Sequence, residues 1–214
     1  MIKLKAILTS AALALTAFAA QADGLQDLEK FLQSVNSGKS SFTQVVTSPK
    51  RASDTVARSK TSSGSFEFLR PNRFRFVYNK PFEQTIVADS QTLWLYDVDL
   101  NQVTSRPQKD ALGSTPAALI ASGTDIKGLS AAFELKAGPA QDGTEWVEAR
   151  PKDRNGQLQS VRVGFRQGQL AVLDIQDSLG QRSVLTFNDW QANPALKTAD
   201  FTFQPPAGAA VIKP

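Results

Sequence analysis

The chain has 214 residues, of which 41% are hydrophobic and 21% charged, and its formal net charge is +4. This composition is ordinary for a globular protein and argues against a disordered chain. The sequence contains neither cysteine nor histidine. That excludes disulfides, thiolate and imidazole metal sites, cysteine nucleophiles, triads with a histidine base, and lipid anchors attached through cysteine.

The first 22 residues have the pattern of a secretory signal peptide. Lys3 and Lys5 precede an apolar stretch that ends in the A-x-A cleavage site Ala20-Gln21-Ala22. The stretch is shorter than the roughly 20 residues that a membrane-spanning helix needs. We therefore expect cleavage of residues 1–22, one domain over residues 23–214, and a location in the periplasm, where a chain without thiols avoids oxidation.

An amphipathic helix is expected at the start of the mature chain. Asp23 followed by Gln26 resembles a capping box, and apolar residues then recur at helical spacing until Ser37-Gly38 ends the pattern. The apolar residues are Leu25, Leu28, Phe31, Leu32 and Val35. Such a helix has one apolar face that must lie against another element.

Strand signals dominate the rest of the chain. In Arg73-Phe74-Arg75-Phe76-Val77-Tyr78 the aromatic residues alternate strictly with the others, which predicts a strand with one aromatic face. Leu93 and Leu95 share one face of a later run and Trp94 and Tyr96 the other, which predicts a strand covered on both sides. The expected strands are 41–47, 66–68, 73–78, 85–88, 92–97, 101–106, 132–137, 144–149, 157–165, 169–176 and 183–190.

About eleven strands joined mostly by short turns form an antiparallel meander, which curls into a barrel or a strongly bent sheet. Two segments break the pattern. Residues 48–63 are polar and basic and are expected to form a solvated loop or a long hairpin tip. Residues 109–129 contain three glycines and a short helix expected to begin at Thr115-Pro116, which is typical of a lid or plug.

Few residues suggest chemistry. Asp97-Val98-Asp99 places two carboxylates on one face of a strand, but a charged turn before Asn101 is the favoured interpretation. Glu145 and Glu148 fall on opposite faces of a strand. We therefore expect no catalytic residue, no metal site and no cofactor, and the chain lacks the basic run of a nucleic-acid binding protein. A hydrolase that uses carboxylates alone remains the alternative from a different functional class.

The aromatic residues say more about function. Phenylalanine, which has no polar group, occurs 13 times, against 3 tryptophans and 2 tyrosines. Phe66, Phe68, Phe74 and Phe76 fall at equivalent positions of adjacent strands. Periodicity alone favours an ordinary core. A single bent sheet with too few helices to fill its concave side suggests instead an apolar cavity that helices close.

Arg70 lies in the most distinctive stretch, Arg70-Pro71-Asn72-Arg73-Phe74. Pro71 biases Arg70 toward an extended conformation at the end of a strand, where the guanidinium group can reach backbone carbonyls. By residue type alone, a surface arginine with a partly buried stem is the commoner outcome.

A series of short motifs follows the helix in a fixed order. They are Ser41-Phe42-Thr43-Gln44, Gly64-Ser65-Phe66, Arg70-Pro71-Asn72-Arg73-Phe74, Ile86-Val87-Ala88-Asp89, Leu93-Trp94-Leu95-Tyr96-Asp97, Asn101-Gln102-Val103-Thr104, Thr115-Pro116 and Phe201-Thr202-Phe203-Gln204-Pro205-Pro206. Their order and spacing resemble the periplasmic outer-membrane lipoprotein carrier family, LolA, over essentially the whole mature chain. The sister family LolB shares the fold but is anchored through a cysteine, which this chain lacks.

The resemblance implies a half-open β-barrel of eleven strands with a lid of helices over an apolar cavity. A monomeric carrier of this kind takes the acyl chains of lipoproteins released by the inner-membrane LolCDE transporter and passes them to the outer-membrane receptor LolB. The resemblance also implies that Arg70 holds the lid shut through backbone carbonyls, and that the lid comprises residues 25–35 and 109–122. A carrier of another lipid or of a glycolipid is the alternative within this class.

The candidate site residues follow from these expectations. The candidates for the cavity lining are Phe66, Phe68, Phe74, Phe76, Tyr78, Trp94 and Tyr96. The candidates for the lid are Leu25, Leu28, Phe31, Leu32, Leu112, Pro116, Leu119 and Ile120.

Overall fold

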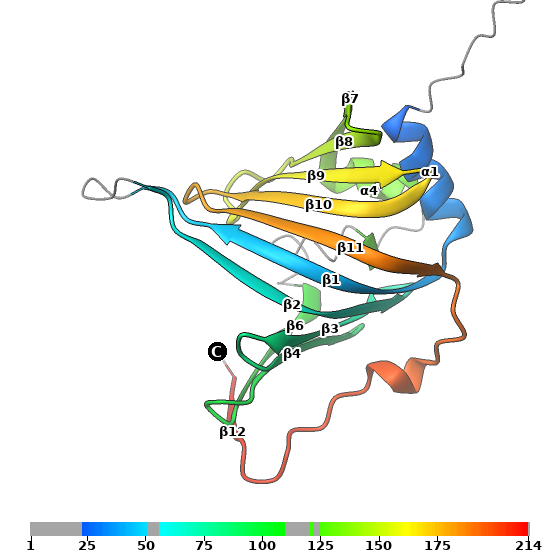
Figure 1. The fold of residues 1–214 in the computed structure, drawn as a ribbon. Helices are drawn as coiled ribbons and strands as arrows, with labels where there is room; N and C mark the ends of the chain where they lie inside the picture. Colours follow the sequence, from blue (N-terminus) through cyan, green and yellow to red (C-terminus); the bar gives the residue numbers. More distant parts are fainter. Residues whose placement is uncertain (1–22, 51–55, 110–119, 122–124, 214) are drawn as a thin grey trace, which may run out of the picture.

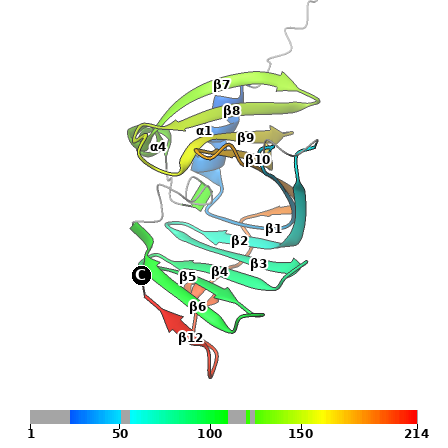
Figure 2. The same ribbon diagram turned by 90° about the vertical axis from the view of Figure 1, so that its left-hand side faces the viewer.

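Twelve strands form one strongly curved sheet in the structure, a computed structural model that describes residues 23–50, 56–109, 120–121 and 125–213. The strand order is β12-β6-β5-β4-β3-β2-β1-β11-β10-β9-β8-β7, so β12 and β7 are the two ends of an open half-barrel (Figures 1 and 2). The strands pair antiparallel except β12 with β6, which are parallel. The expected signal peptide lies outside the described residues.

Most strands follow the predicted runs, with ends that differ by a few residues, but β2 begins at Ser59, well before the predicted strand 66–68. Their bounds are β1 Ser37–Thr47, β2 Ser59–Leu69, β3 Arg73–Lys80, β4 Gln84–Asp89, β5 Thr92–Asp97, β6 Gln102–Pro107, β7 Phe133–Gln141, β8 Thr144–Pro151, β9 Leu158–Arg166, β10 Gln169–Asp177, β11 Arg182–Ala192 and β12 Ala210–Ile212.

Antiparallel pairing places successive turns at opposite ends of the strands. The row of strand ends on one side, called here the open edge, carries the β1–β2, β3–β4, β5–β6, β8–β9 and β10–β11 connections. The opposite edge, called here the helix edge, carries the β2–β3, β4–β5, β7–β8 and β9–β10 turns, and β1 begins there directly after the first helix.

The predicted first helix is confirmed as α1, Gly24–Ser34, with Asp23 as its N-cap, whose side chain accepts a hydrogen bond from the Leu25 amide. It ends at Ser34, before the predicted Ser37-Gly38, because β1 already begins at Ser37. Leu28, Phe31 and Leu32 are buried. These residues belong to the same hydrophobic cluster as the phenylalanines of β2 and β3, so α1 packs on the concave side of the sheet.

The outer, convex side is covered by the C-terminal segment. Trp94 and Tyr96 of β5 lie with their ring centroids 5.6 and 6.2 Å from that of Phe203. The short helix η1, Thr198–Phe201, contacts β3 and β4 and buries Phe201 completely. The prediction that strand 92–97 is covered on both sides is therefore confirmed, and the tail continues into β12, one strand more than the eleven expected.

Two further segments differ from the sequence-based expectation. The polar stretch 48–63 is shorter as a loop, because β2 already begins at Ser59. Among the described residues a second helix, α4, Ile126–Ala132, begins within residues 109–129, where the sequence predicts only one short helix, at Thr115-Pro116. Asp125 caps it by accepting a hydrogen bond of 2.7 Å from the Gly128 amide, and Leu129 is buried.

Three charged residues lie directly opposite one another on the convex side of β1, β2 and β3. Glu67 of β2 is buried and accepts hydrogen bonds from Lys39, with a nitrogen–oxygen distance of 3.0 Å, and from Arg75. Arg75 also donates to the Asp200 carbonyl at 2.8 Å, which ties the C-terminal segment to the sheet. Burial by itself would raise the pKa of Glu67, but the bonds from Lys39 and Arg75 outweigh burial and hold that pKa below its ordinary value of 4.5.

We expect acid to remove the stabilisation that Glu67 provides. A carboxyl whose pKa is lowered in the folded state contributes stability above its unfolded pKa, and this is lost as the pH falls below 4.5 through the folded pKa. Glu67→Gln should lower the free energy of unfolding at neutral pH by about 1–2 kcal/mol and flatten its acid dependence. Urea unfolding over a pH series measures both.

Glu134→Gln is the matched control, because Glu134 also pairs with a lysine, Lys136, but on an exposed surface. Its stability should match that of the parent protein. An unchanged acid limb in Glu67→Gln would contradict the assignment.

Candidate functional site

Arg70 follows the last residue of β2 at the helix edge and is only 8% exposed. Its backbone amide donates to the Asn36 carbonyl at 2.8 Å, which fixes the start of the turn beneath the end of α1. The commoner outcome for an arginine, a solvated surface side chain, is not what the structure shows.

The guanidinium group of Arg70 binds the C-terminal end of α1. Its Nη1 donates to the carbonyl oxygens of Phe31 at 3.3 Å and Leu32 at 3.0 Å, and to that of Val35. The last carbonyls of a helix lack partners within the helix and carry its partial negative charge. The last turn of α1 contains no basic residue of its own, so Arg70 supplies the missing cation from another element.

The same guanidinium group also binds a second segment. Nε and Nη2 donate to the Ile120 carbonyl at 3.2 and 2.9 Å, and the Asn72 amide donates to the Ala121 carbonyl at 3.0 Å. The guanidinium carbon lies 5.0 Å from the ring centroid of Phe31 and 5.4 Å from that of Phe68. One side chain thus joins α1, residues 120–121 and the sheet.

Burial lowers the pKa of Arg70 to about 10, so the side chain stays protonated at neutral pH. Its partners are carbonyl dipoles, which compensate the buried charge only while both segments are in place. Separating the segments therefore exposes an arginine and frees several carbonyls together.

Asn72 and Gln108 complete this attachment and were not among the predicted site residues. Gln108 is 2% exposed, donates from Nε2 to the Asn72 carbonyl at 2.7 Å and accepts from the Ser90 amide at 2.9 Å. Asn72 has a φ of 63°, a left-handed conformation that asparagine tolerates better than most residues. The distinctive stretch Arg70-Pro71-Asn72-Arg73 could have indicated a structural role for Asn72. Nothing in the sequence distinguishes Gln108 from a solvated glutamine.

The phenylalanines proposed for the cavity come together on the concave face. Phe66 and Phe76 stack with centroids 4.5 Å apart, and Phe68 and Phe74 are buried beside them. Tyr78 stands at the border of this group, 5.1 Å from the ring of Phe42, and burial raises its pKa to about 12.

The described lid candidates cover this face. Leu28, Phe31, Leu32 and Ile120 belong to the same buried cluster, and Leu25 packs against it. Leu112, Pro116 and Leu119 lie outside the described residues. The described parts of the lid are therefore closed on the phenylalanines.

Trp94 and Tyr96 require a correction. The strand register aligns Phe74 and Phe76 with Ala88 and Ile86 of β4, and these with Leu93 and Leu95 of β5. Trp94 and Tyr96 therefore point to the convex side, where Phe203 covers them. They are not part of the concave lining. The prediction was wrong because periodicity shows which residues of one strand share a face, but not which of its two faces is concave.

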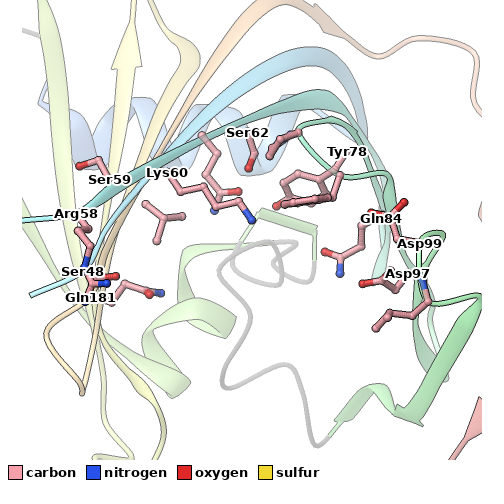
Figure 3. Close-up of a pocket in the computed structure, with 15 residues that line it drawn as sticks. Ser48, Arg58, Ser59, Lys60, Ser62, Tyr78, Gln84, Asp97, Asp99 and Gln181 are labelled. Carbon is pink, nitrogen blue, oxygen red and sulfur yellow. Dashed lines mark hydrogen bonds between the residues drawn. The ribbon is translucent and has the colours of Figure 1, made fainter.

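A pocket of about 660 Å³ continues the concave face toward the open edge. Figure 3 shows Tyr78 and Gln84 on one wall and Ser59, Lys60 and Ser62 of β2 on another. Its lining is mixed, with Val46, Phe82 and Leu100 adding apolar surface. Tyr78 borders both this pocket and the aromatic cluster, so the two are adjacent.

The carboxylates singled out in the sequence are Asp97 and Asp99, which both line this pocket, and Glu145 and Glu148 on β8. Asp97 accepts a hydrogen bond of 3.1 Å from the Leu100 amide, which confirms the charged turn. Glu145 and Glu148 are three residues apart on β8 and point to opposite faces. Over the described ranges, no group of three or more acidic residues is placed to hold a metal ion.

None of the helices in the described parts of the chain is long and apolar enough to cross a membrane.

A half-barrel with a phenylalanine-lined concave face, closed by a helix and a second segment that one buried arginine holds, defines a carrier for apolar ligands. Comparison with known families identifies the kind of carrier. The family described as "Outer membrane lipoprotein carrier protein LolA" matches residues 33–204. The chain belongs to the LolA family.

Relatives of high sequence identity agree with this assignment. The chain is 61% identical over 198 residues to an outer-membrane lipoprotein carrier protein of Albidiferax ferrireducens, covering 91% of this chain and 92% of that protein. It is 53% identical over 195 residues to one of Leptothrix cholodnii, covering 91% and 88%. A solved structure of an uncharacterized conserved protein from Thermus thermophilus shares the fold, with a TM-score of 0.51 and 14% identity over 89% of this chain and 97% of that chain.

Replacing Arg70 should loosen both segments that it joins. Arg70→Leu removes charge-assisted hydrogen bonds, each worth about 1.5–3 kcal/mol, so amide hydrogen exchange should accelerate in α1 and remain slow in the central strands β1 and β11. Arg70→Lys keeps the charge but loses the planar guanidinium group, so its exchange rate in α1 should lie between those of the parent protein and Arg70→Leu. Exchange in α1 that matches the parent protein would contradict the attachment.

Proposed function

We propose that this chain carries lipoproteins across the periplasm, holding their acyl chains between the lid and the phenylalanine-lined face. The observation that carries the proposal is the Arg70 side chain, which joins both described parts of the lid over an apolar face. Membership of the LolA family and the names of the relatives support the cargo class.

The partners and location follow from this cargo. The chain receives lipoproteins from an inner-membrane LolCDE-type transporter and passes them to an outer-membrane LolB-type receptor. It works as a monomer in the periplasm after loss of residues 1–22, without catalysis, metal or cofactor. The signal-peptide pattern and the absence of cysteine and histidine support these points.

The energetics of acyl-chain binding explain why a carrier needs a latched lid. Burying one methylene is worth about 0.8 kcal/mol. Several acyl chains hold dozens of methylenes, so partial burial alone approaches the ceiling of about 20 kcal/mol for reversible complexes. Cargo bound so tightly would not leave. The closed lid competes with cargo for the same apolar face, which lowers the net affinity.

The acyl chains enter from the open edge in this proposal. The helix edge is closed by α1, residues 120–121 and the Arg70 bonds. The pocket at the open edge adjoins the aromatic cluster at Tyr78. Cargo that advances past Tyr78 would replace ring contacts of Phe66 and Phe76 and lift the lid.

Arg70→Leu should separate loading from delivery. The variant loses bonds that exist only in the closed, empty state, so its affinity for cargo rises. Release of a labelled lipoprotein from spheroplasts into a complex with the carrier should persist. The subsequent fraction passed to the outer-membrane receptor should fall at least tenfold, and Arg70→Lys should be intermediate.

Arg73→Leu is the control, because Arg73 lies three residues away on the same turn and its Nη1 donates to the Pro71 carbonyl at 3.2 Å. Its loading and delivery should match the parent protein. Normal delivery by Arg70→Leu, or failure at loading with delivery intact, would rule out the latch.

A photo-crosslinking amino acid should distinguish the two faces of the sheet. With p-benzoylphenylalanine in place of Tyr78, irradiation of the loaded carrier should attach the acyl chains of the lipoprotein. The same replacement of Trp94, on the convex side, should not. Mass spectrometry of the cross-linked peptide identifies the attached group, and equal yields at the two positions would contradict the proposed cavity.

A further inference from the structure

Large hydrophobic side chains are exposed along the open edge of the sheet. Among the described residues they occupy the turns after β1, β3, β5 and β10: Val56 is 71% exposed, Phe82 57%, Val98 36%, Leu100 68% and Leu179 81%. In the described part of the chain no turn of the helix edge has such a side chain; those turns hold polar residues, glycine and proline, such as Asp142-Gly143 and Gln167-Gly168. The two edges therefore differ in chemistry.

Two of these turns hold their leucines outward by the same device. Asp97 accepts a hydrogen bond from the Leu100 amide at 3.1 Å, and Asp177 accepts one from the Leu179 amide at 2.9 Å. Asp177 also accepts from the Gln181 amide at 2.7 Å. These backbone amides at both tips therefore already have hydrogen-bond acceptors within the turn. This matters because an amide without an acceptor is costly to place in an apolar medium.

These tips surround the pocket at the open edge. Phe82, Leu100 and Gln181 all line the pocket, although they come from three different turns. The β10–β11 turn also lies near the β1–β2 connection, since a Cβ placed on Gly180 would be 3.8 Å from Pro49. The exposed side chains thus form one rim around the opening that leads to the aromatic cluster.

We propose that this rim docks on the surface of a lipid bilayer. Single apolar side chains on separate tips along one edge can reach a flat surface together, whereas a protein interface needs a contiguous packed core. Docking there would hold the opening of the pocket close to the membrane surface, where the proposed transporter and receptor lie.

Charge at the rim supports weak, reversible docking. Lys60 lies 4.6 Å from the ring centroid of Phe82, and the exposed Lys80 is two residues before it. Each cation near an anionic bilayer contributes about 1 kcal/mol, roughly a fivefold gain in affinity. Acidic residues offset these cations, because the exposed Glu83 directly follows Phe82 and Asp97 and Asp99 flank Val98. The apolar tips therefore carry the larger share of the binding.

Vesicle co-sedimentation of the purified chain without cargo tests the proposal. The chain should bind vesicles of phosphatidylcholine, and bind more strongly when phosphatidylglycerol replaces part of it, with salt weakening only the second effect. Leu100→Ser and Leu179→Ser should each lower the partition coefficient about tenfold. Because both side chains are exposed, circular dichroism should show unchanged folding.

Val98→Ser and Val45→Ser form a matched pair. The two valines are equally exposed, at 36% and 37%, but Val45 lies within β1 and not on a turn. Only Val98→Ser should weaken vesicle binding. Equal losses in the pair, or no binding by the parent chain, would overturn the proposal.

The inference extends the proposed function and can fail separately from it. If the leucine variants lose delivery to the receptor while the parent chain binds no vesicles, the rim contacts a protein and the bilayer proposal is wrong. If vesicle binding is as expected but no lipoprotein is carried, the proposed cargo is wrong and the docking surface stands.

Discussion

The closed conformation depends on one buried cation, the Arg70 guanidinium group, which is stabilised by hydrogen bonds to backbone carbonyls and not by a carboxylate. Arg70 gives the end of α1 the positive charge that the helix itself lacks, and the same group holds Ile120. A carboxylate partner would travel with one element and keep most of its attraction when the other moved. Carbonyls on two separate segments tie both segments to one side chain, so that removing this side chain would loosen both.

The two faces of the sheet divide stability and function between them. On the convex side the C-terminal segment, the Lys39–Glu67–Arg75 cluster and the rings of Trp94 and Phe203 hold the strands of one half together. On the concave side the contacts are almost wholly apolar, and in the proposed function acyl chains would replace them. The contacts that brace the sheet from the convex side do not involve the lid.

Local patterns predicted most of the elements, and non-local contacts decided what was missed. Asp23 and the apolar repeat that follows it predicted α1, and the strict alternation of side-chain types predicted β3 and β5. The inward face of β5 depends on its register with β4 and β3, so Trp94 and Tyr96 were assigned to the wrong side. Burial of Arg70 depends on the end of α1, which no local rule brings near. The helix α4 was not predicted, because the three glycines of residues 109–129 favoured loops there and the N-cap at Asp125 was not recognised.

The order of strands has a consequence for how the chain acquires its shape. The central pair joins Phe42 of β1 to Phe187 of β11, and β12 returns to pair with β6, so the defining contacts link distant parts of the sequence. Chains with such high contact order fold slowly, because long loops must close before these contacts form. As the chain is made, the apolar face of β2 and β3 therefore emerges long before β11 can join β1. The unfinished half-barrel is itself an apolar surface that folding helpers would have to shield.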